Sequence, residues 1–136
     1  MGVLRGHALA FHKVGYRDGS GKCDIVASEN RTVYGALFML AEAELPALDV
    51  HEGVGEGYER RATRILNERG HPIDAWTYVA TRTDPSLRPY TWYKRHVLEG
   101  AREARLPLAY LHMIELTAAI EDPDAERARG ELSLYG

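Results

Sequence analysis

The spacing of the apolar residues changes once along this chain, and that change limits the folds it can form. Up to Thr83 the apolar residues mostly alternate with polar ones, which is typical of β-strands. From Thr91 onward they recur at helical spacing. The 136 residues are enough for one domain with its own core. Strands, a short helix, a hairpin and then helices predict a single α+β domain over residues 1–136.

Five strands are expected in the first part of the chain. We place them at residues 4–13, 23–27, 32–40, 58–68 and 74–83. A turn at Glu29–Arg31 is expected between the second and third strands, and a turn at Arg69–Pro72 joins the last two in a hairpin. The third strand is apolar nearly throughout, so we expect burial on both of its faces, as in a sheet that curls over a core.

Four helices are expected, at residues 41–51, 91–105, 106–120 and 124–130. The second helix carries an inner face of mostly small residues, namely Tyr93, Val97, Gly100, Ala101 and Ala104. The third carries apolar residues at helical spacing, namely Leu108, Leu111, Leu116 and Ala119. Each of these two helices therefore offers one face for packing.

The segment 45–58 holds the main candidate for chemistry. Leu45, Leu48 and Glu52 fall at i, i+3 and i+7 of the first helix, so one face carries two leucines and a carboxylate. Gly53 ends that helix and begins a glycine turn whose backbone can approach a ligand closely. We expect the leucines to direct Glu52 toward the core, where a desolvated carboxyl group takes up and returns a proton. The alternative is an exposed Glu52 at the end of a surface helix.

Two tyrosines are candidates for the walls of such a site. Tyr93 lies on the inner face at the first turn of its helix, where its hydroxyl could reach a cavity. It could equally be a core tyrosine with a backbone partner. Tyr58 follows the glycine turn and opens a strand, either as a pocket wall or as ordinary packing.

Three other kinds of site are disfavoured. His51-Glu52 begins like the zinc-binding His-Glu-x-x-His, but position 55 is glycine, and the remaining histidines lack ligand spacing, so no metal is expected. Cys23 lies in an expected strand, where a cysteine is more often packing than a nucleophile. The glycine turn lacks the spacing of a phosphate-binding loop.

The composition argues against several classes of partner and location. The net charge is −3 and the 17 lysines and arginines form no basic stripe, so no nucleic-acid partner is expected. No apolar run approaches the roughly 20 residues of a membrane span, and the N-terminus lacks the apolar segment of a secretion signal, so we expect no membrane association. Cys23 is the only cysteine, which excludes a disulfide framework and favours the cytoplasm.

Three segments of the chain form a specific set. They are Thr32-Val-Tyr-Gly-Ala-Leu-Phe, Leu48-Asp-Val-His-Glu-Gly-Val-Gly-Glu-Gly-Tyr58 and Tyr93-Lys-Arg-His-Val-Leu-Glu-Gly-Ala-Arg-Glu-Ala-Arg-Leu-Pro-Leu-Ala-Tyr110. Together they resemble the γ-glutamylcyclotransferase-like proteins, which include the AIG2-like group. The resemblance covers most of the chain, from Leu4 to Ile120.

The resemblance implies a small, mixed, partly open β-barrel flanked by helices. It also implies release of 5-oxoproline from γ-glutamyl amines, amino acids or peptides, a reaction of glutathione metabolism that needs no cofactor or metal. The family's catalytic glutamate falls on Glu52 and its substrate-contacting tyrosine on Tyr93, and we expect Tyr58 and Gly53 to belong to the same substrate site.

The chemistry of that reaction suits a single carboxylate. The substrate's α-amine attacks its own γ-carbonyl, and well-aligned intramolecular attack reaches effective molarities of about 10⁵ M or more. Glu52 can take the proton from the attacking amine and return it to the leaving amine. The identity of the leaving amine stays open.

The chain departs from the family at its N-terminus. Family members begin with a strand that ends in a Tyr-Gly-Ser-Asn loop, and this chain starts after that point, so we expect the domain to lack its first strand. If the given start omits that strand, the protein is an enzyme. If half of the site is lost, it is a non-catalytic ligand-binding or interaction protein on the same scaffold. A missing strand exposes a sheet edge, which predicts a homodimer or strand donation from another chain.

Overall fold

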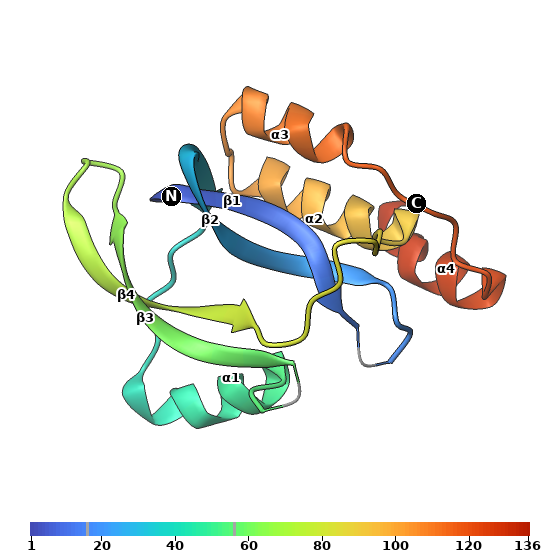
Figure 1. Ribbon diagram of the computed structural model, residues 1–136, viewed down its shortest axis with the longest axis horizontal. Helices are drawn as coiled ribbons and strands as arrows, with labels where there is room; N and C mark the ends of the chain where they lie inside the picture. Colours follow the sequence, from blue (N-terminus) through green and yellow to red (C-terminus); the bar gives the residue numbers. More distant parts are fainter. Residues whose placement is uncertain (16, 56) are drawn as a thin grey trace.

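Two antiparallel hairpins form the sheet of this protein. In the computed structural model, which describes residues 1–15, 17–55 and 57–136, β1 (Gly2–Val14) pairs with β2 (Gly21–Gly35), and β3 (Tyr58–Leu66) pairs with β4 (Pro72–Ala80). The strand order is β2-β1-β3-β4, and each neighbouring pair is antiparallel (Figure 1). The expected hairpin of the last two strands is therefore confirmed.

A bulge replaces the turn that was expected at Glu29–Arg31. On one side of the bulge Arg5 pairs with Thr32. On the other side His7 pairs with Ala27, so the intervening residues of β2 stand out of the ladder. The expected second and third strands are therefore one long strand, and the polar residues between them bend it instead of reversing it.

The apolar stretch after β2 is not a buried strand, which corrects the expected strand at residues 32–40. β2 ends at Gly35, and residues 36–41 carry no regular structure. Phe38 and Met39 are both exposed. The composition of this segment is strand-like, but it has no ladder partner in the described residues, and among its large apolar side chains only Leu37 is partly buried.

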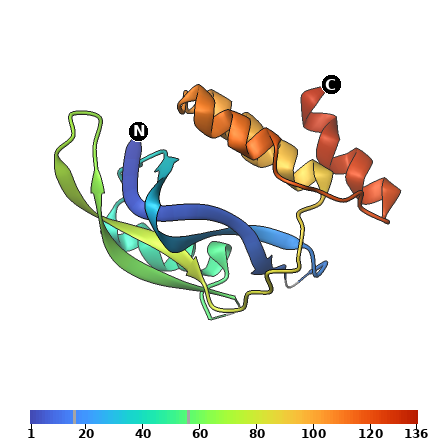
Figure 2. The ribbon, with the colours of Figure 1, turned by 45° about the horizontal axis from the view of Figure 1, so that its top comes forward.

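The two hairpins touch only near their ends. Among the described residues a single ladder pair, Val3 with Leu66, joins β1 to β3. At the opposite end the Val14 N–H donates to the carbonyl oxygen of Arg82 at 3.0 Å. Figure 2 shows the hairpins diverging between these two points. The sheet is therefore open, in agreement with the expected α+β class.

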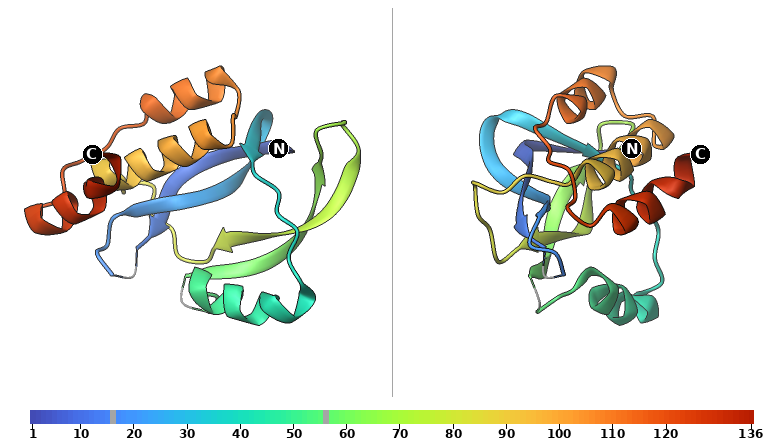
Figure 3. Two further views of the ribbon diagram at one scale, coloured as in Figure 1. Left: turned by 180° about the vertical axis from the view of Figure 1, so that it is seen from behind. Right: turned by 90° about the vertical axis from the view of Figure 1, so that its right-hand side faces the viewer.

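The helices lie on both sides of the sheet. They are η1 (Glu42–Glu44), α1 (Leu45–Glu52), α2 (Thr91–Glu103), α3 (Leu108–Glu115), α4 (Ala125–Leu132) and η2 (Ser133–Tyr135). Figures 1 and 3 show α2 and α3 side by side on one side of the molecule and α1 on the other. In the described part of the chain no helix has the length and apolar character needed to cross a bilayer.

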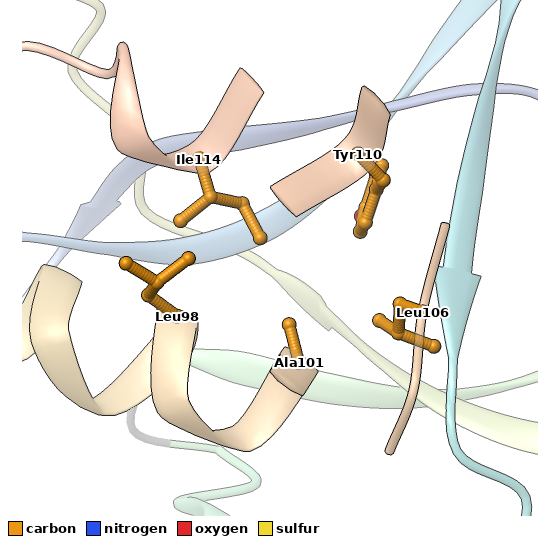
Figure 4. Packing of buried hydrophobic residues seen from close by; sticks show 5 residues of the cluster. All are labelled: Leu98, Ala101, Leu106, Tyr110 and Ile114. Carbon is orange, nitrogen blue, oxygen red and sulfur yellow. The ribbon is translucent and has the colours of Figure 1, made fainter. Parts of the chain in front are cut away.

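The core lies between α2, α3 and the β1–β2 hairpin. Its buried members are Leu98, Ala101, Leu106, Tyr110 and Ile114, which Figure 4 shows gathered between the two helices. Ala101 belongs to the inner face expected for α2. The face expected for α3 was correct at Leu111, which packs against the core, and wrong at Leu108 and Leu116, which are exposed. Tyr110 and Ile114 are buried instead.

We expect Leu98→Ala to destabilise the protein by about 2–4 kcal/mol, because the side chain is 8% exposed and its removal leaves a cavity in the core. The matched control is Leu108→Ala, the same change at a side chain that is 82% exposed, and it should cost less than about 1 kcal/mol. Urea unfolding measures both values. Equal losses from the two variants would contradict the assignment of the core.

Candidate functional site

Two tyrosine hydroxyls meet at the backbone of Cys23. The Tyr58 hydroxyl donates to the Cys23 carbonyl oxygen at 2.6 Å, and the Cys23 N–H donates to the Tyr93 hydroxyl at 3.0 Å. Tyr58 begins β3, Tyr93 lies in the first turn of α2, and Cys23 lies in β2. We call this pair of bonds the tyrosine latch, and it joins both hairpins to the helical layer.

Burial governs the chemistry of the latch. It raises the pKa of Tyr93 far above the usual value, and it does the same for Tyr58, where the charges of Asp24 and Glu52 add to the rise. Burial also raises the pKa of the Cys23 thiol to about 11. Both phenols therefore stay protonated at neutral pH, and a buried, protonated thiol is a poor nucleophile, as was expected for Cys23.

A lysine packs over each tyrosine ring. The Lys22 ammonium lies 4.5 Å from the centre of the Tyr93 ring and donates to Asp18 at 3.1 Å and to Ser20 at 2.9 Å. The Lys13 ammonium lies 4.6 Å from the centre of the Tyr58 ring. Such cation–π contacts stabilise the orientation of both rings.

Lys13 also explains one residue of the glycine turn. It is 4% exposed, and burial, with the like charges of Lys22 and Arg82, lowers its pKa. A Cβ on Gly57 would lie 2.7 Å from the Lys13 Cε, and Gly57 has a φ of +134°. Glycine suits this position, because a φ of +134° is unfavourable for other residues and a Cβ would force the end of the Lys13 side chain to move.

A buried carboxylate connects the latch to β1 and β4. The Asp24 side chain is 3% exposed, and one of its oxygens lies 2.6 Å from the His12 Nε2. Its other oxygen accepts from the Ala80 N–H at 2.9 Å. Asp24, the residue after Cys23, therefore links β2 to β1 and to β4.

Glu52 does not face the core, which corrects the expectation for α1. The helix has no buried residue, and the Glu52 side chain is exposed. The Tyr58 N–H donates to the carbonyl oxygen of Gly53, the residue after Glu52, at 3.4 Å, and the Glu52 charge adds a little to the raised pKa of Tyr58. Gly53 ends α1 as expected, with a φ of +81°.

Polar contacts, and not a core face, attach α1 to the sheet. The Tyr78 hydroxyl donates to Asp49 Oδ1 at 2.8 Å, and Arg60 Nε lies 3.0 Å from the same oxygen. Burial of the phenol, this hydrogen bond, and the charges of Asp49 and Glu52 raise the pKa of Tyr78 to about 12. Tyr78 therefore links β4 to α1.

The structure brings the four predicted site residues into one region. Glu52 and Gly53 end α1, Tyr58 follows the glycine turn, and Tyr93 shares the Cys23 backbone with Tyr58. Their roles in binding or catalysis stay predictions. The alternative weighed for Tyr93, a core tyrosine with a backbone partner, matches its observed contact.

Sequence reasoning missed the charged neighbours of these residues. Lys13, Asp24 and Tyr78 were each placed in strands without a role. The one available signal for Lys13 was its position two residues after Phe11, on the same side of an expected strand. In residues 1–15, 17–55 and 57–136 no three metal-binding side chains gather, and the absence of a metal stays an expectation.

A comparison with known protein families assigns the chain to one of them. The profile of the AIG2-like family matches residues 32–114, which is more than half of the chain and includes Glu52, Gly53, Tyr58 and Tyr93. The protein therefore belongs to the AIG2-like family.

Known relatives refine this assignment. A curated gamma-glutamylcyclotransferase from Bos taurus is 31% identical over 91 residues, which cover 66% of this chain and 48% of that protein. The chain thus spans about half the length of the curated relative that it matches.

Solved structures confirm the fold. A gamma-glutamyl cyclotransferase structure superimposes with a TM-score of 0.86 over 98% of this chain and 82% of its own, at 22% identity. An uncharacterized protein from Homo sapiens gives a TM-score of 0.79 over 94% of this chain and 82% of its own, also at 22% identity.

We expect Tyr93→Phe to lower the free energy of unfolding at pH 8 by about 1–3 kcal/mol, because it leaves the Cys23 N–H without its acceptor. The loss should shrink at pH 11. The unfolded Tyr93 ionises near pH 10, whereas the folded one has a raised pKa, so the wild type loses stability as the pH rises above 10. Phenylalanine has no such dependence.

Urea unfolding at the two pH values measures the difference. Tyr135→Phe is the control, since it removes a hydroxyl that bonds to His96 near the C-terminus and lies outside the latch. A Tyr93→Phe effect that stays constant between pH 8 and pH 11 would contradict the buried, protonated phenol.

Proposed function

We propose that this protein is an enzyme of the γ-glutamylcyclotransferase type. In the proposed reaction the α-amine of a γ-glutamyl compound attacks its own γ-carbonyl carbon. A C–N bond closes the five-membered ring of 5-oxoproline, and the C–N bond to the leaving amine breaks. One proton moves from the attacking nitrogen to the leaving nitrogen, so the reaction needs no oxidant, reductant or water.

Glu52 is the proposed carrier of that proton. It stands at the end of α1, where the chain turns back through Gly53, so a small substrate has access to its carboxylate. A substrate bound over it excludes water from the carboxylate, and a desolvated carboxylate is a stronger base. Glu52 can therefore accept the proton when the substrate binds and release it to the leaving amine.

The tyrosines have a separate proposed role. Both phenols stay protonated and each has its oxygen fixed at the Cys23 backbone, so we assign them to the wall of the substrate site. A fixed wall restricts the conformations of a flexible γ-glutamyl chain and favours ring closure. The observation that carries this proposal is that Gly53, the residue directly after Glu52, accepts a hydrogen bond from the Tyr58 N–H within the segment that matches the AIG2-like family.

Glu52→Gln is expected to reduce 5-oxoproline release by at least about 100-fold, because a carboxamide cannot shuttle the proton. The melting temperature should change little, since the Glu52 side chain is exposed. Glu44→Gln, the same change at an exposed glutamate of η1, is the control and should keep full activity. The measurement is chromatographic detection of 5-oxoproline from a panel of γ-glutamyl amines, amino acids and peptides. Undiminished release by Glu52→Gln would refute the role.

A second candidate function is interaction with another chain on the same scaffold, without catalysis. The observation that favours it is the open sheet, in which only Val3 and Leu66 pair across the two hairpins in the described residues. Unpaired strand edges accept extended segments, including those of a second copy. On this alternative the protein is a homodimer and the γ-glutamyl panel gives no product.

Sedimentation velocity over a wide concentration range separates the two candidates. A stable dimer without 5-oxoproline release supports the interaction protein. A monomer that releases 5-oxoproline excludes it.

A further inference from the structure

An apolar groove runs along α1 toward Glu52. Its volume is about 460 Å³, and it opens between α1, the segment after β2, and β4. Leu45 and Leu48 form one wall, Leu37 and Met39 form part of another, and Trp76 and Tyr78 of β4 complete it. Leu45 and Leu48, which do not face the core, therefore line this groove.

The groove and the proposed catalytic carboxylate are both built on α1. Leu45, Leu48 and Glu52 lie on one face of α1, so the leucine wall leads along the helix to the carboxylate. Tyr78 lines the groove, and its hydroxyl bonds to Asp49 in the last turns of the same helix. Leu48, at the end of the leucine wall, is therefore one helical turn from Glu52, where the γ-glutamyl bond would be cleaved.

The lining is suited to hydrocarbon and not to charge. Asp74 is the one acidic residue of the lining, and its carboxylate lies 3.4 Å from Arg64 in an exposed ion pair. Trp76 is 55% exposed, and Phe38 and Met39 extend the apolar surface at the mouth. Large apolar side chains exposed together mark a surface that is covered in the working state.

We propose that this groove binds the apolar side chain of the leaving amine, so that the preferred substrates are γ-glutamyl derivatives of aliphatic or aromatic amines and amino acids. This inference rests on the proposed function, because it assigns a specificity to the same site. The glutamyl part lies at Glu52 and the tyrosine latch, and the leaving part extends from Glu52 along the leucine wall. A polar or charged leaving group would have to give up its hydration in a lining whose two polar side chains, Asp74 and Tyr78, are already bonded to other residues.

The first test compares γ-glutamyl-leucine with γ-glutamyl-alanine in the full chain. The value of kcat/KM for 5-oxoproline release should be at least about tenfold higher for the leucine compound, since each methylene in an apolar pocket is worth about tenfold or more. Equal values for the two compounds overturn the inference and leave the proposed function standing. No release from any γ-glutamyl compound refutes the proposed function itself.

A matched pair of variants locates the preference in the groove. Leu48→Gln keeps the side-chain length and introduces another good helix former, and it should reduce kcat/KM about tenfold more for γ-glutamyl-leucine than for γ-glutamyl-alanine. Leu108→Gln makes the same change on α3, outside the groove, and should alter neither value. A preference that survives Leu48→Gln overturns the inference.

A binding measurement keeps the inference testable if Leu48→Gln fails to fold. Of the two tryptophans, Trp76 lines the groove and Trp92 is buried elsewhere. In the Glu52→Gln variant, γ-glutamyl-leucine should shift the fluorescence of Trp76 to shorter wavelength, and γ-glutamyl-alanine at the same concentration should not. The inference is overturned if the leucine compound binds without such a shift, or if a second copy covers the groove and Trp76 emission changes only with protein concentration.

Discussion

The two hydrogen bonds of the tyrosine latch are the contacts on which the rest of this structure depends. The two hairpins share one ladder pair in the described residues. Helices α2 and α3 both lie on one side of the sheet. Tyr58 and Tyr93 bring β3 and α2 to the same backbone unit of β2. Asp24, the next residue, reaches His12 and the Ala80 N–H. A short stretch of β2 is therefore the point at which otherwise separate parts are joined.

The position of α1 follows from a different balance of forces. The helix contributes nothing to the core, and its apolar residues line an open groove. Asp49 holds it through Arg60 and Tyr78, so directional polar bonds set its orientation. An element held in this way can keep a carboxylate accessible to a ligand without losing its place. Burial would have fixed the helix more firmly but would have closed the approach to Glu52.

The sequence was sufficient to predict the order of the elements, because strand and helix spacings are local properties. The hairpin of β3 and β4 and the position of α2 follow directly from those spacings. The buried face of α3 was missed because Tyr110, an amphipathic residue, and Ile114 fill it, while Leu108 and Leu116 face outward. Hydrophobicity alone did not distinguish the two faces.

The candidate site was predicted in part. The glycine turn and the helical spacings indicated Glu52 and Tyr93, and the family resemblance implied their roles. The buried charges at Lys13 and Asp24 could not be found, because in a strand pattern they are indistinguishable from solvent-facing residues. Their burial depends on Tyr58 and His12, which come from other strands. The exposure of Glu52 matches the alternative that the sequence left open, since Leu45 and Leu48 predict an apolar neighbour without saying whether it is the core or a groove.

The dual use of the latch has an evolutionary consequence. Selection for folding alone is enough to retain both tyrosines, because each satisfies a backbone group of Cys23. The carboxylate of Glu52 has no comparable structural role, since its side chain is exposed and Asp49 attaches α1 to the sheet. Among descendants of this chain, the glutamate can therefore drift as soon as the chemistry is no longer needed, while the tyrosines persist. Only the glutamate would then distinguish an active lineage from an inactive one.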